Sequence, residues 1–346
     1  MSAIDRALVA LRRGGDLIPA ATFVLMALCF YLVPRLYGKD VEWSSAYSAM
    51  QTLASYGLLA LGIGIGMIAG VFDLSVLGMF ALGGMLAVKT GGDSPLLGVV
   101  VAAGVGLLAG CAQGSLVARL KLNSMSVSLG GYLVMLGLTR AIGSDESVPY
   151  GNVYVGIDLD KPILEVFSWH SLIVFACFVV VGLVLRYTRI GRDTRAVGGD
   201  ERASRIAGVR VGAVTAGVFA VSGALAGIAG ALNSFSLASA TPDPGFAPLV
   251  FAATAALIGG VAFSGGRGSA LGIAMGTLSL ALLQATFGIL ASPEWVSQAV
   301  TGGLLVVAAV VAAPRIADHV ASLRARFARQ PQSLESKERS SHAVSS

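Results

Sequence analysis

The side chains able to contact or transform a solute are few in this sequence, and most of them are uncharged. Asp73 is the only carboxylate within a long apolar stretch, GVFDLSVLGMFALGG, and Ser75 follows it by two residues. The other polar side chains of interest in apolar stretches are amides: Gln51, Gln113, Asn233, Gln284 and Gln298. Such amides either hydrogen-bond the hydroxyl groups of a neutral solute or join neighbouring helices.

Two interpretations of Asp73 are open. As a cap, its carboxylate would accept a backbone N–H at the start of the following helix, where negative charge is favoured. As a functional group it would line a polar cavity, because placing a carboxylate inside hydrocarbon costs free energy and such residues usually have a function. The two roles are compatible, since a broken membrane helix often ends beside such a cavity. We favour the cap.

Sequence signatures of catalysis are missing. The chain has no GxxxxGK[ST] phosphate loop and no HExxH or GxSxG motif. The cluster Gly265-Gly266-Arg267-Gly268 lacks the lysine of a phosphate loop, so we interpret it as a turn. The three cysteines lie far apart without a CxxC pair or a histidine at ligand spacing. We therefore expect no enzyme, and no metal or cofactor bound by this chain.

The elements that hold these side chains must be membrane helices. Of the 346 residues, 55% are hydrophobic and 12% are charged, and the mean hydropathy is +0.79. Soluble domains carry roughly 25% charged residues. The composition therefore predicts an all-α polytopic membrane protein. The net charge of +5 is better explained by membrane topology than by nucleic-acid binding, which we do not expect.

We predict about ten transmembrane helices. Apolar runs long enough to cross roughly 30 Å of hydrocarbon occupy residues 17–34, 47–70, 74–89, 95–118, 126–142, 167–187, 212–235, 247–263, 269–290 and 295–313. The third run is the shortest. The basic residues before the first run imitate a signal peptide, but no cleavage site follows, so we expect this run to be retained as a span.

The distribution of charge predicts the orientation. With ten spans and a cytoplasmic N-terminus, 19 of the 24 Lys and Arg residues fall on the cytoplasmic side, as positive charge does in membrane proteins. Residues 1–16 are then a cytoplasmic N-terminus, 17–313 a single transmembrane domain, and 314–346 a cytoplasmic tail. The tail has too few apolar residues to pack, so we expect it to be largely disordered.

Two connections are longer than the rest. The external segment 143–168 is acidic, and the alternation in its VYVGIDLD run predicts a short strand. The cytoplasmic segment 188–211 reads TRIGRDTRAVGGDERASRIAGVRV and carries six arginines against three acids. So charged a segment must protrude into water.

Within that cytoplasmic segment the pattern predicts a short helix. We expect Gly198 and Gly199 to break the chain, and Asp200 to cap a helix with Glu201 in its first turn. The helix would present a small apolar face made by Ala203, Ile206 and Ala207. Such a face is suited to a shallow groove on a partner.

Three segments, in this order, resemble the membrane permease of ATP-binding-cassette importers. The resemblance is to the ribose-type (monosaccharide) branch, which is related to branched-chain amino-acid permeases. VFDLSV is similar to that family's GIDLSVG turn, GRDTRAVGGDERASRIAGVRV to its cytoplasmic coupling segment, and ALIGGVAFSGGRGSALGIAMG to its glycine-rich block. The resemblance covers nearly the whole chain.

This resemblance implies partners on both faces of a bacterial inner membrane. The permease would pair with a second permease subunit, identical or sister, and two ATPase subunits would bind ATP and Mg²⁺ on the cytoplasmic side. A solute-binding protein would deliver the solute outside. The implied ATPase-coupling residues are Gly191, Arg192, Gly199, Asp200, Glu201, Ala203, Arg205 and Gly208. The candidate translocation path comprises Asp73, Ser75, Gln113, Asn233 and Gln284.

The chain departs from the family pattern around that path. The changed positions are Asp200 for an asparagine, Val71-Phe72 for Gly-Ile, Asn123-Ser124-Met125 for Pro-Pro-Phe, and Gln284-Ala285 for a frequent Asn-Asn pair. These changes leave the transported sugar open.

The expected function is therefore a permease subunit for a monosaccharide of the ribose, xylose or galactose type. The intramembrane polar groups are mostly uncharged, which favours a sugar over an amino acid with charged ends. A branched-chain amino acid, a polyol or a furanone-like signal remain alternatives within the same architecture. From a different class, an energy-independent channel or facilitator is the alternative, and co-purification with an ATPase subunit would discriminate between them.

Overall fold

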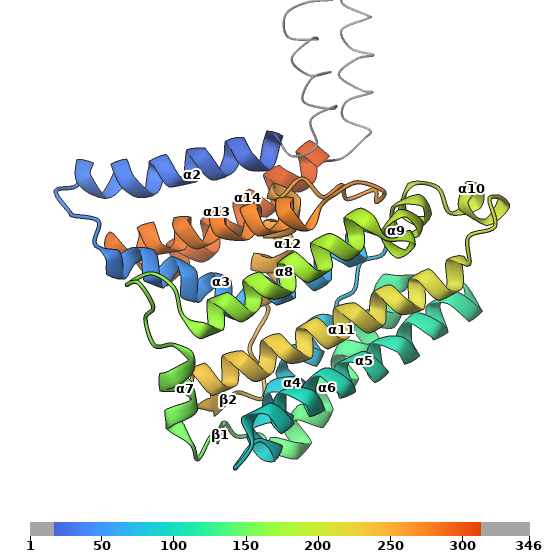
Figure 1. Cartoon of the computed structure of the whole chain (residues 1–346), viewed down its shortest axis with the longest axis horizontal. Coiled ribbons are helices and arrows are strands. Elements are labelled where there is room, and N and C mark those ends of the chain that lie inside the picture. Colours follow the sequence, from blue (N-terminus) through green and yellow to red (C-terminus); the bar gives the residue numbers. More distant parts are fainter. Residues whose placement is uncertain (1–16, 313–346) are drawn as a thin grey trace, which may run out of the picture.

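The computed structural model describes residues 17–312. The predictions for the N-terminal segment and for the cytoplasmic tail lie outside these residues. The described part is a bundle of α-helices with one two-stranded ladder (Figure 1). The prediction of an all-α membrane protein is confirmed, because eight of the helices in this part are long and apolar enough to cross a membrane.

The helices follow the predicted apolar runs closely. The long ones are α2 (Leu17–Leu36), α3 (Trp43–Ile68), α5 (Pro95–Leu120), α6 (Ser124–Gly143), α8 (Trp169–Tyr187), α11 (Val211–Ser236), α13 (Ala270–Ile289) and α14 (Glu294–Ala312). Two shorter apolar helices are α4 (Ser75–Thr90) and α12 (Ala247–Ile258). The remaining elements are α7 (Val153–Leu159), α9 (Arg189–Gly199), α10 (Glu201–Ile206), β1 (Val148–Pro149) and β2 (Ser239–Ala240).

Two of the ten predicted spans are too short to cross hydrocarbon alone. α4 has 16 residues and α12 has 12, which correspond to about 24 Å and 18 Å of helix at 1.5 Å per residue. The predicted span 247–263 ends at Ile258 because Gly259 and Gly260 follow, and Gly260 has a φ of +78°. The prediction that the third run is the shortest is therefore wrong.

The core lies around α3 and α11. α3 packs against α11, α12 and α13, and α11 packs against α4 and α5. Close packing of α11 depends on small residues, because Cβ atoms added at Gly223 or Gly227 would overlap carbonyl oxygens of α5. This is the packing role of glycine that membrane helices show generally. α2 and α14 are mostly exposed on the outside of the bundle.

The two ends of the bundle differ. α9 and α10 lie at one end, together with the Leu17 end of α2 and the Ala312 end of α14 (Figure 1). α7, β1 and β2 lie at the opposite end. This arrangement agrees with the even number of crossings that the charge distribution predicts.

The predicted external strand is wrong, because the VYVGIDL run forms helix α7. Its Val155 and Leu159 stand four residues apart, one helical turn, and both pack against one buried apolar cluster. In a run of only seven residues, the sequence alone does not distinguish this helical spacing from the alternation of a strand. Gly156 lies so close to the carbonyl oxygen of Phe235 that a Cβ there would overlap it. The external strand is instead β1, which pairs antiparallel with β2.

Candidate functional site

The arginine-rich segment folds into two helices separated at Asp200. The prediction that Gly198 and Gly199 break the chain is wrong, because they form the last turn of α9, and Asp200 has the extended φ of −157°. Asp200 caps α10 as predicted, since its Oδ1 accepts the Ala203 N–H at 2.9 Å. Gly208 follows the helix with a φ of +84°, a conformation that glycine adopts without strain.

The outer face of α10 is apolar and uncovered. Ala203, Ile206 and Ala207 are exposed, and Ile206 has 89% of its surface accessible. On the polar side of the same helix, Arg205 donates to Glu201 at 2.6 Å, an exposed ion pair one turn apart. An exposed isoleucine flanked by alanines on a charged segment has the properties of a small docking surface.

α9 holds this segment against the bundle. Gly191 lies against the Leu185 carbonyl oxygen with no room for a Cβ. Arg195 donates to the same carbonyl at 2.7 Å. Arg192 and Gly199 are exposed. Gly191 is therefore needed for close packing at the end of α8, while Arg192 faces outward at the same end as α10.

The carboxylate of Asp73 lies in the break between α3 and α4. It is 2% exposed, and its Oδ1 accepts hydrogen bonds from the Ser75 N–H at 2.9 Å and the Ser75 hydroxyl at 2.5 Å. The N-cap position of α4 is Leu74 and has no side-chain cap, so the predicted Asp73 cap is displaced by one residue and acts on the N–H of the first helical residue. The second oxygen, Oδ2, has no hydrogen-bond partner in the part of the chain that the structure describes.

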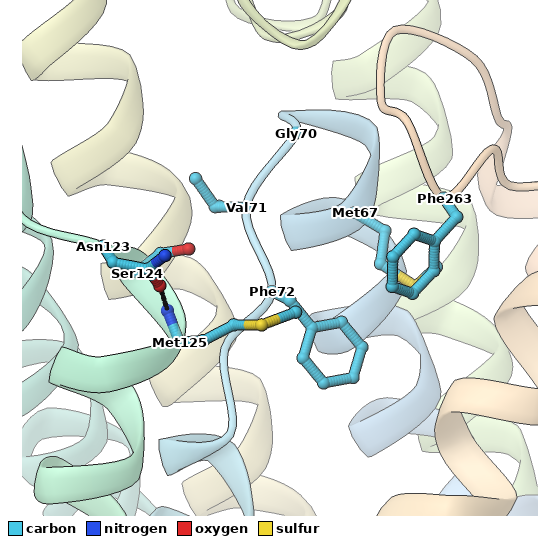
Figure 2. A pocket seen from close by; sticks show the side chains of 8 residues that line it. All are labelled: Met67, Gly70, Val71, Phe72, Asn123, Ser124, Met125 and Phe263. Atoms are coloured by element: carbon cyan, nitrogen blue, oxygen red, sulfur yellow. Dashed lines mark hydrogen bonds between the residues drawn. The ribbon is translucent and has the colours of Figure 1, made fainter.

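A cavity of about 190 Å³ lies beside this break. Figure 2 shows its lining residues, which come from three segments: Met67, Gly70, Val71, Phe72, Asn123, Ser124, Met125 and Phe263. The Phe72 and Phe263 ring centroids are 6.2 Å apart, and the polar lining residues are Asn123 and Ser124. Two of the family departures, at residues 71–72 and 123–125, thus meet in one cavity.

A second cavity, of about 450 Å³, joins this region to the coupling segment. It shares Gly70, Val71 and Ser124 with the smaller cavity. Its other side includes four of the predicted coupling residues: Gly199, Asp200, Glu201 and Arg205. The coupling segment and the break after α3 therefore line the same cavity.

None of the five candidate path residues lines either cavity. Gln113 lies on α5 against Gly131 of α6, and neither polar atom of its side chain has a partner among residues 17–312. Asn233 lies on α11 and Gln284 on α13, both half-buried. Only Asp73 and Ser75 are joined by a hydrogen bond, so the structure does not bring the five residues together.

The aromatic pair at the cavity was not predicted from the sequence. Phe72 and Phe263 are 191 positions apart, and neither stands out from the apolar residues around it. The one available signal was that Phe72 occupies a position where the family pattern has isoleucine.

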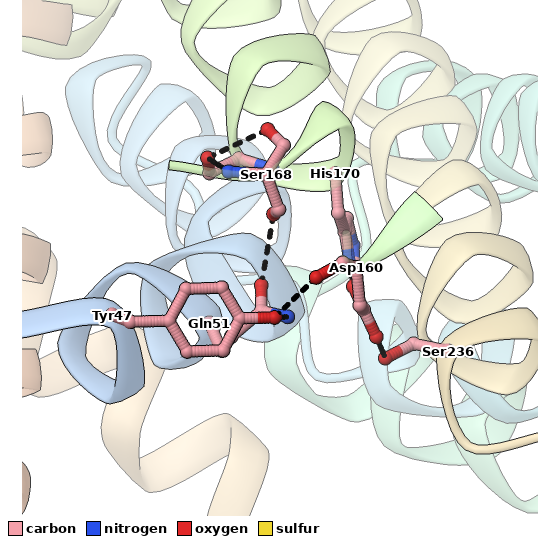
Figure 3. Close-up of polar contacts among 7 residues, drawn as sticks. Tyr47, Gln51, Asp160, Ser168, His170 and Ser236 are labelled. Atoms are coloured by element: carbon pink, nitrogen blue, oxygen red, sulfur yellow. Dashed lines mark hydrogen bonds and ion pairs between the residues drawn. The ribbon is translucent and has the colours of Figure 1, made fainter. Parts of the chain in front are cut away.

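A polar cluster lies at the opposite end of the bundle, and of its residues the sequence pointed only to Gln51, which hydrogen-bonds Tyr47 and Ser168. His170 is buried and its Nδ1 lies 3.4 Å from Asp160 Oδ1, while the Ser236 hydroxyl donates to Asp160 Oδ2 (Figure 3). Tyr47 donates to the Asp160 carbonyl oxygen. The cluster ties α3, α7, α8 and α11 together at a place where residues more than a hundred positions apart meet.

Comparison with known proteins assigns the class. The family described as "Branched-chain amino acid transport system / permease component" matches residues 46–309, three quarters of the chain. The chain belongs to this family, and it is a multi-pass inner-membrane permease with eight helices of spanning length in its described part. The predicted resemblance is thereby confirmed.

Its curated relatives are import permeases. A fructose import permease of Rhizobium meliloti is 28% identical over 85% of this chain and 83% of its own length. A ribose import permease of Escherichia coli strain K12 is 26% identical over 84% and 91%. An L-arabinose transport system permease of the same strain is 31% identical over 74% and 78%. No solved structure matches the chain.

Proposed function

We propose that this chain is the membrane subunit of an ATP-binding-cassette importer for a monosaccharide. The observation that carries this proposal is the exposed apolar face of α10, capped by Asp200 and placed at the positively charged end of the bundle. The chain has no phosphate loop, so the energy for uphill import would come from ATPase subunits docked on this face. ATP and Mg²⁺ would be bound by those subunits.

The residues that line the smaller cavity support a sugar as the substrate. Its wall combines the two phenylalanine rings with the amide and hydroxyl groups of Asn123 and Ser124, and none of its lining residues is charged. Neutral hydroxyl-bearing solutes are recognised by such mixed apolar and hydrogen-bonding surfaces. The relatives named for fructose, ribose and L-arabinose point the same way.

The remaining partners follow from the same architecture. A second permease subunit would complete the path, and a solute-binding protein would dock at the end that carries α7. A branched-chain amino acid, a polyol or a furanone-like signal are the alternative solutes.

The docking of α10 is tested by exchanging its exposed isoleucine. Ile206→Asn should greatly reduce recovery of an ATPase subunit with the tagged permease, because the side chain is 89% exposed and contributes to docking rather than to the fold. Arg202→Gln, a neighbouring exposed change outside the apolar face, is the matched control. Failure of the unaltered permease to recover any ATPase subunit from native membranes would favour a channel.

The solute is tested by uptake. Cells that express candidate ATPase and binding-protein subunits are compared with and without this permease. The two should differ in uptake of one radiolabelled sugar among ribose, arabinose, fructose, xylose and galactose. Uptake of leucine in place of all sugars would overturn the sugar assignment and leave the importer architecture in place.

A further inference from the structure

Three chain segments meet backbone to backbone at the end of the bundle that carries the coupling segment. They are the break after α3 at Gly70, the last turn of α9 at Gly198, and the loop between α12 and α13 at Gly265 and Gly266. The Gly266 N–H donates to the Ile68 carbonyl oxygen at 2.9 Å. We call these four glycines the glycine junction.

The junction has no room for side chains. A Cβ at Gly265 would lie 2.5 Å from the Gly198 carbonyl oxygen and 2.8 Å from the Gly70 Cα. A Cβ at Gly198 would overlap the Ile68 carbonyl oxygen and lie 2.7 Å from the Gly266 nitrogen. Gly70, Gly265 and Gly266 also have φ values of +77°, +83° and +77°, which other residues adopt only with strain. The three segments are therefore in direct main-chain contact.

Each segment leads to a different functional feature. Gly198 stands two residues before Asp200, which caps the docking helix α10. Gly70 leads through Val71 to Phe72, and Gly265 follows Phe263 by two residues. The two phenylalanines form the aromatic side of the smaller cavity. The junction thus connects the docking helix to both aromatic residues of the cavity.

The short helices α4 and α12 support this connection. α4 begins five residues after Gly70, and α12 ends seven residues before Gly265. Neither helix spans the hydrocarbon region alone, and interrupted helices are the elements that line transport sites and move in carriers. The breaks beside both helices meet at the end of α9.

We propose that the glycine junction transmits movement of α9 and α10 to Phe72 and Phe263, which open and close the inner end of the path. This inference rests on the proposed function, since the movement comes from a docked ATPase. Main-chain contacts have no rotamers to absorb a displacement, and close-packed interiors transmit strain. The four glycines are positioning residues, and the two phenylalanines are the gate.

The experiment compares two glycines. Gly198→Ala places a methyl group into the Ile68 carbonyl oxygen, whereas Gly182→Ala, on α8, places it 3.5 Å from the Ala270 Cβ, an ordinary contact distance. Both changes are introduced into a permease whose three cysteines are replaced by serine, with Ser124→Cys as the reporter, because Ser124 lines both cavities. The permease is purified with its ATPase subunit.

Two quantities are measured on each complex: the rate of maleimide labelling at the reporter with and without ATP plus vanadate, and sugar uptake per ATP hydrolysed in proteoliposomes. We expect Gly198→Ala to abolish the nucleotide-dependent change in labelling and to lower uptake per ATP by about tenfold, within the range typical of coupling between two sites. Gly182→Ala should match the parent. Equal behaviour of the two variants would overturn the proposal.

A second variant keeps the test decisive if Gly198→Ala does not assemble. Phe263→Ala removes one ring, whose residue is 49% exposed, and leaves the junction glycines unchanged. The reporter should then label rapidly with and without nucleotide, and an unaltered nucleotide response would overturn the gate. Failure of the proposed function is distinguishable, because the parent complex would then show no nucleotide response or recover no ATPase.

Discussion

Asp160 is the residue that His170, Ser236 and Tyr47 all contact in the polar cluster at the α7 end of the bundle. Burial opposes ionisation of its carboxyl group, but the His170 imidazole 3.4 Å away and the hydrogen bond from Ser236 outweigh burial and lower the pKa of Asp160 below its ordinary value. A carboxylate with a depressed pKa stabilises the fold above its unfolded pKa of about 3.9. This stabilisation is lost as the pH falls through the folded-state pKa.

We therefore predict that Asp160→Asn lowers the free energy of unfolding by roughly 1.5–3 kcal/mol at pH 7, the usual range for hydrogen bonds to a charged group. Thermal unfolding of the detergent-solubilised protein would measure it. The difference from the parent should be present above about pH 5 and shrink below about pH 4. Asp158→Asn, an exposed change in α7, which ends one residue before Asp160, is the control, and an equal effect from it would contradict the prediction.

The hydrogen bonds of Asp73 give a second prediction about a single residue. Asp73→Ala leaves the buried Ser75 N–H without its acceptor and should destabilise the protein by roughly 1–3 kcal/mol. Asp73→Asn keeps an acceptor oxygen and should unfold within a few degrees of the parent. If the asparagine variant is folded but transports nothing, the carboxylate has a role in the path beyond the cap.

At the scale of the element, α10 depends on its cap more than a long helix would. It has six residues, and helices this short are not stable without capping and packing. Asp200→Ala should cost about 1 kcal/mol of helix stability and reduce co-purification of the ATPase subunit. Asp200→Asn, which restores the residue of the family pattern and retains capping, should preserve it. Equal recovery with both variants would show that docking does not need an ordered α10.

At the scale of the whole molecule, the orientation in the membrane is the remaining prediction. Arg202 on α10 and Tyr154 on α7 are both exposed and lie at opposite ends of the bundle. In a cysteine-free background, Arg202→Cys should react with an impermeant maleimide only in inverted vesicles, and Tyr154→Cys only in right-side-out vesicles. The reverse pattern would contradict the orientation that positive charge predicts.

Much of this architecture was accessible from the chain alone, because the hydrocarbon region of a membrane imposes strong rules on composition. Long apolar runs predicted the ten helices, and the Asp200 to Ala203 spacing predicted the cap of α10. Those features are local, since each depends on residues within a few positions of one another. The VYVGIDL run was misassigned because seven residues fit both the helical and the strand period. Its packing partner Phe235, which would have distinguished them, is distant in sequence.

The contacts between distant segments were decided by tertiary packing. Gly70, Gly198 and Gly265 are separated by 128 and 67 positions, and nothing in the local sequence of each shows that their main chains touch. The same holds for Phe72 with Phe263 and for His170 with Asp160 and Ser236. Only long-range packing shows that α10 and the cavity are connected. A glycine in the sequence can indicate that another segment lies close to the main chain, but it does not identify that segment.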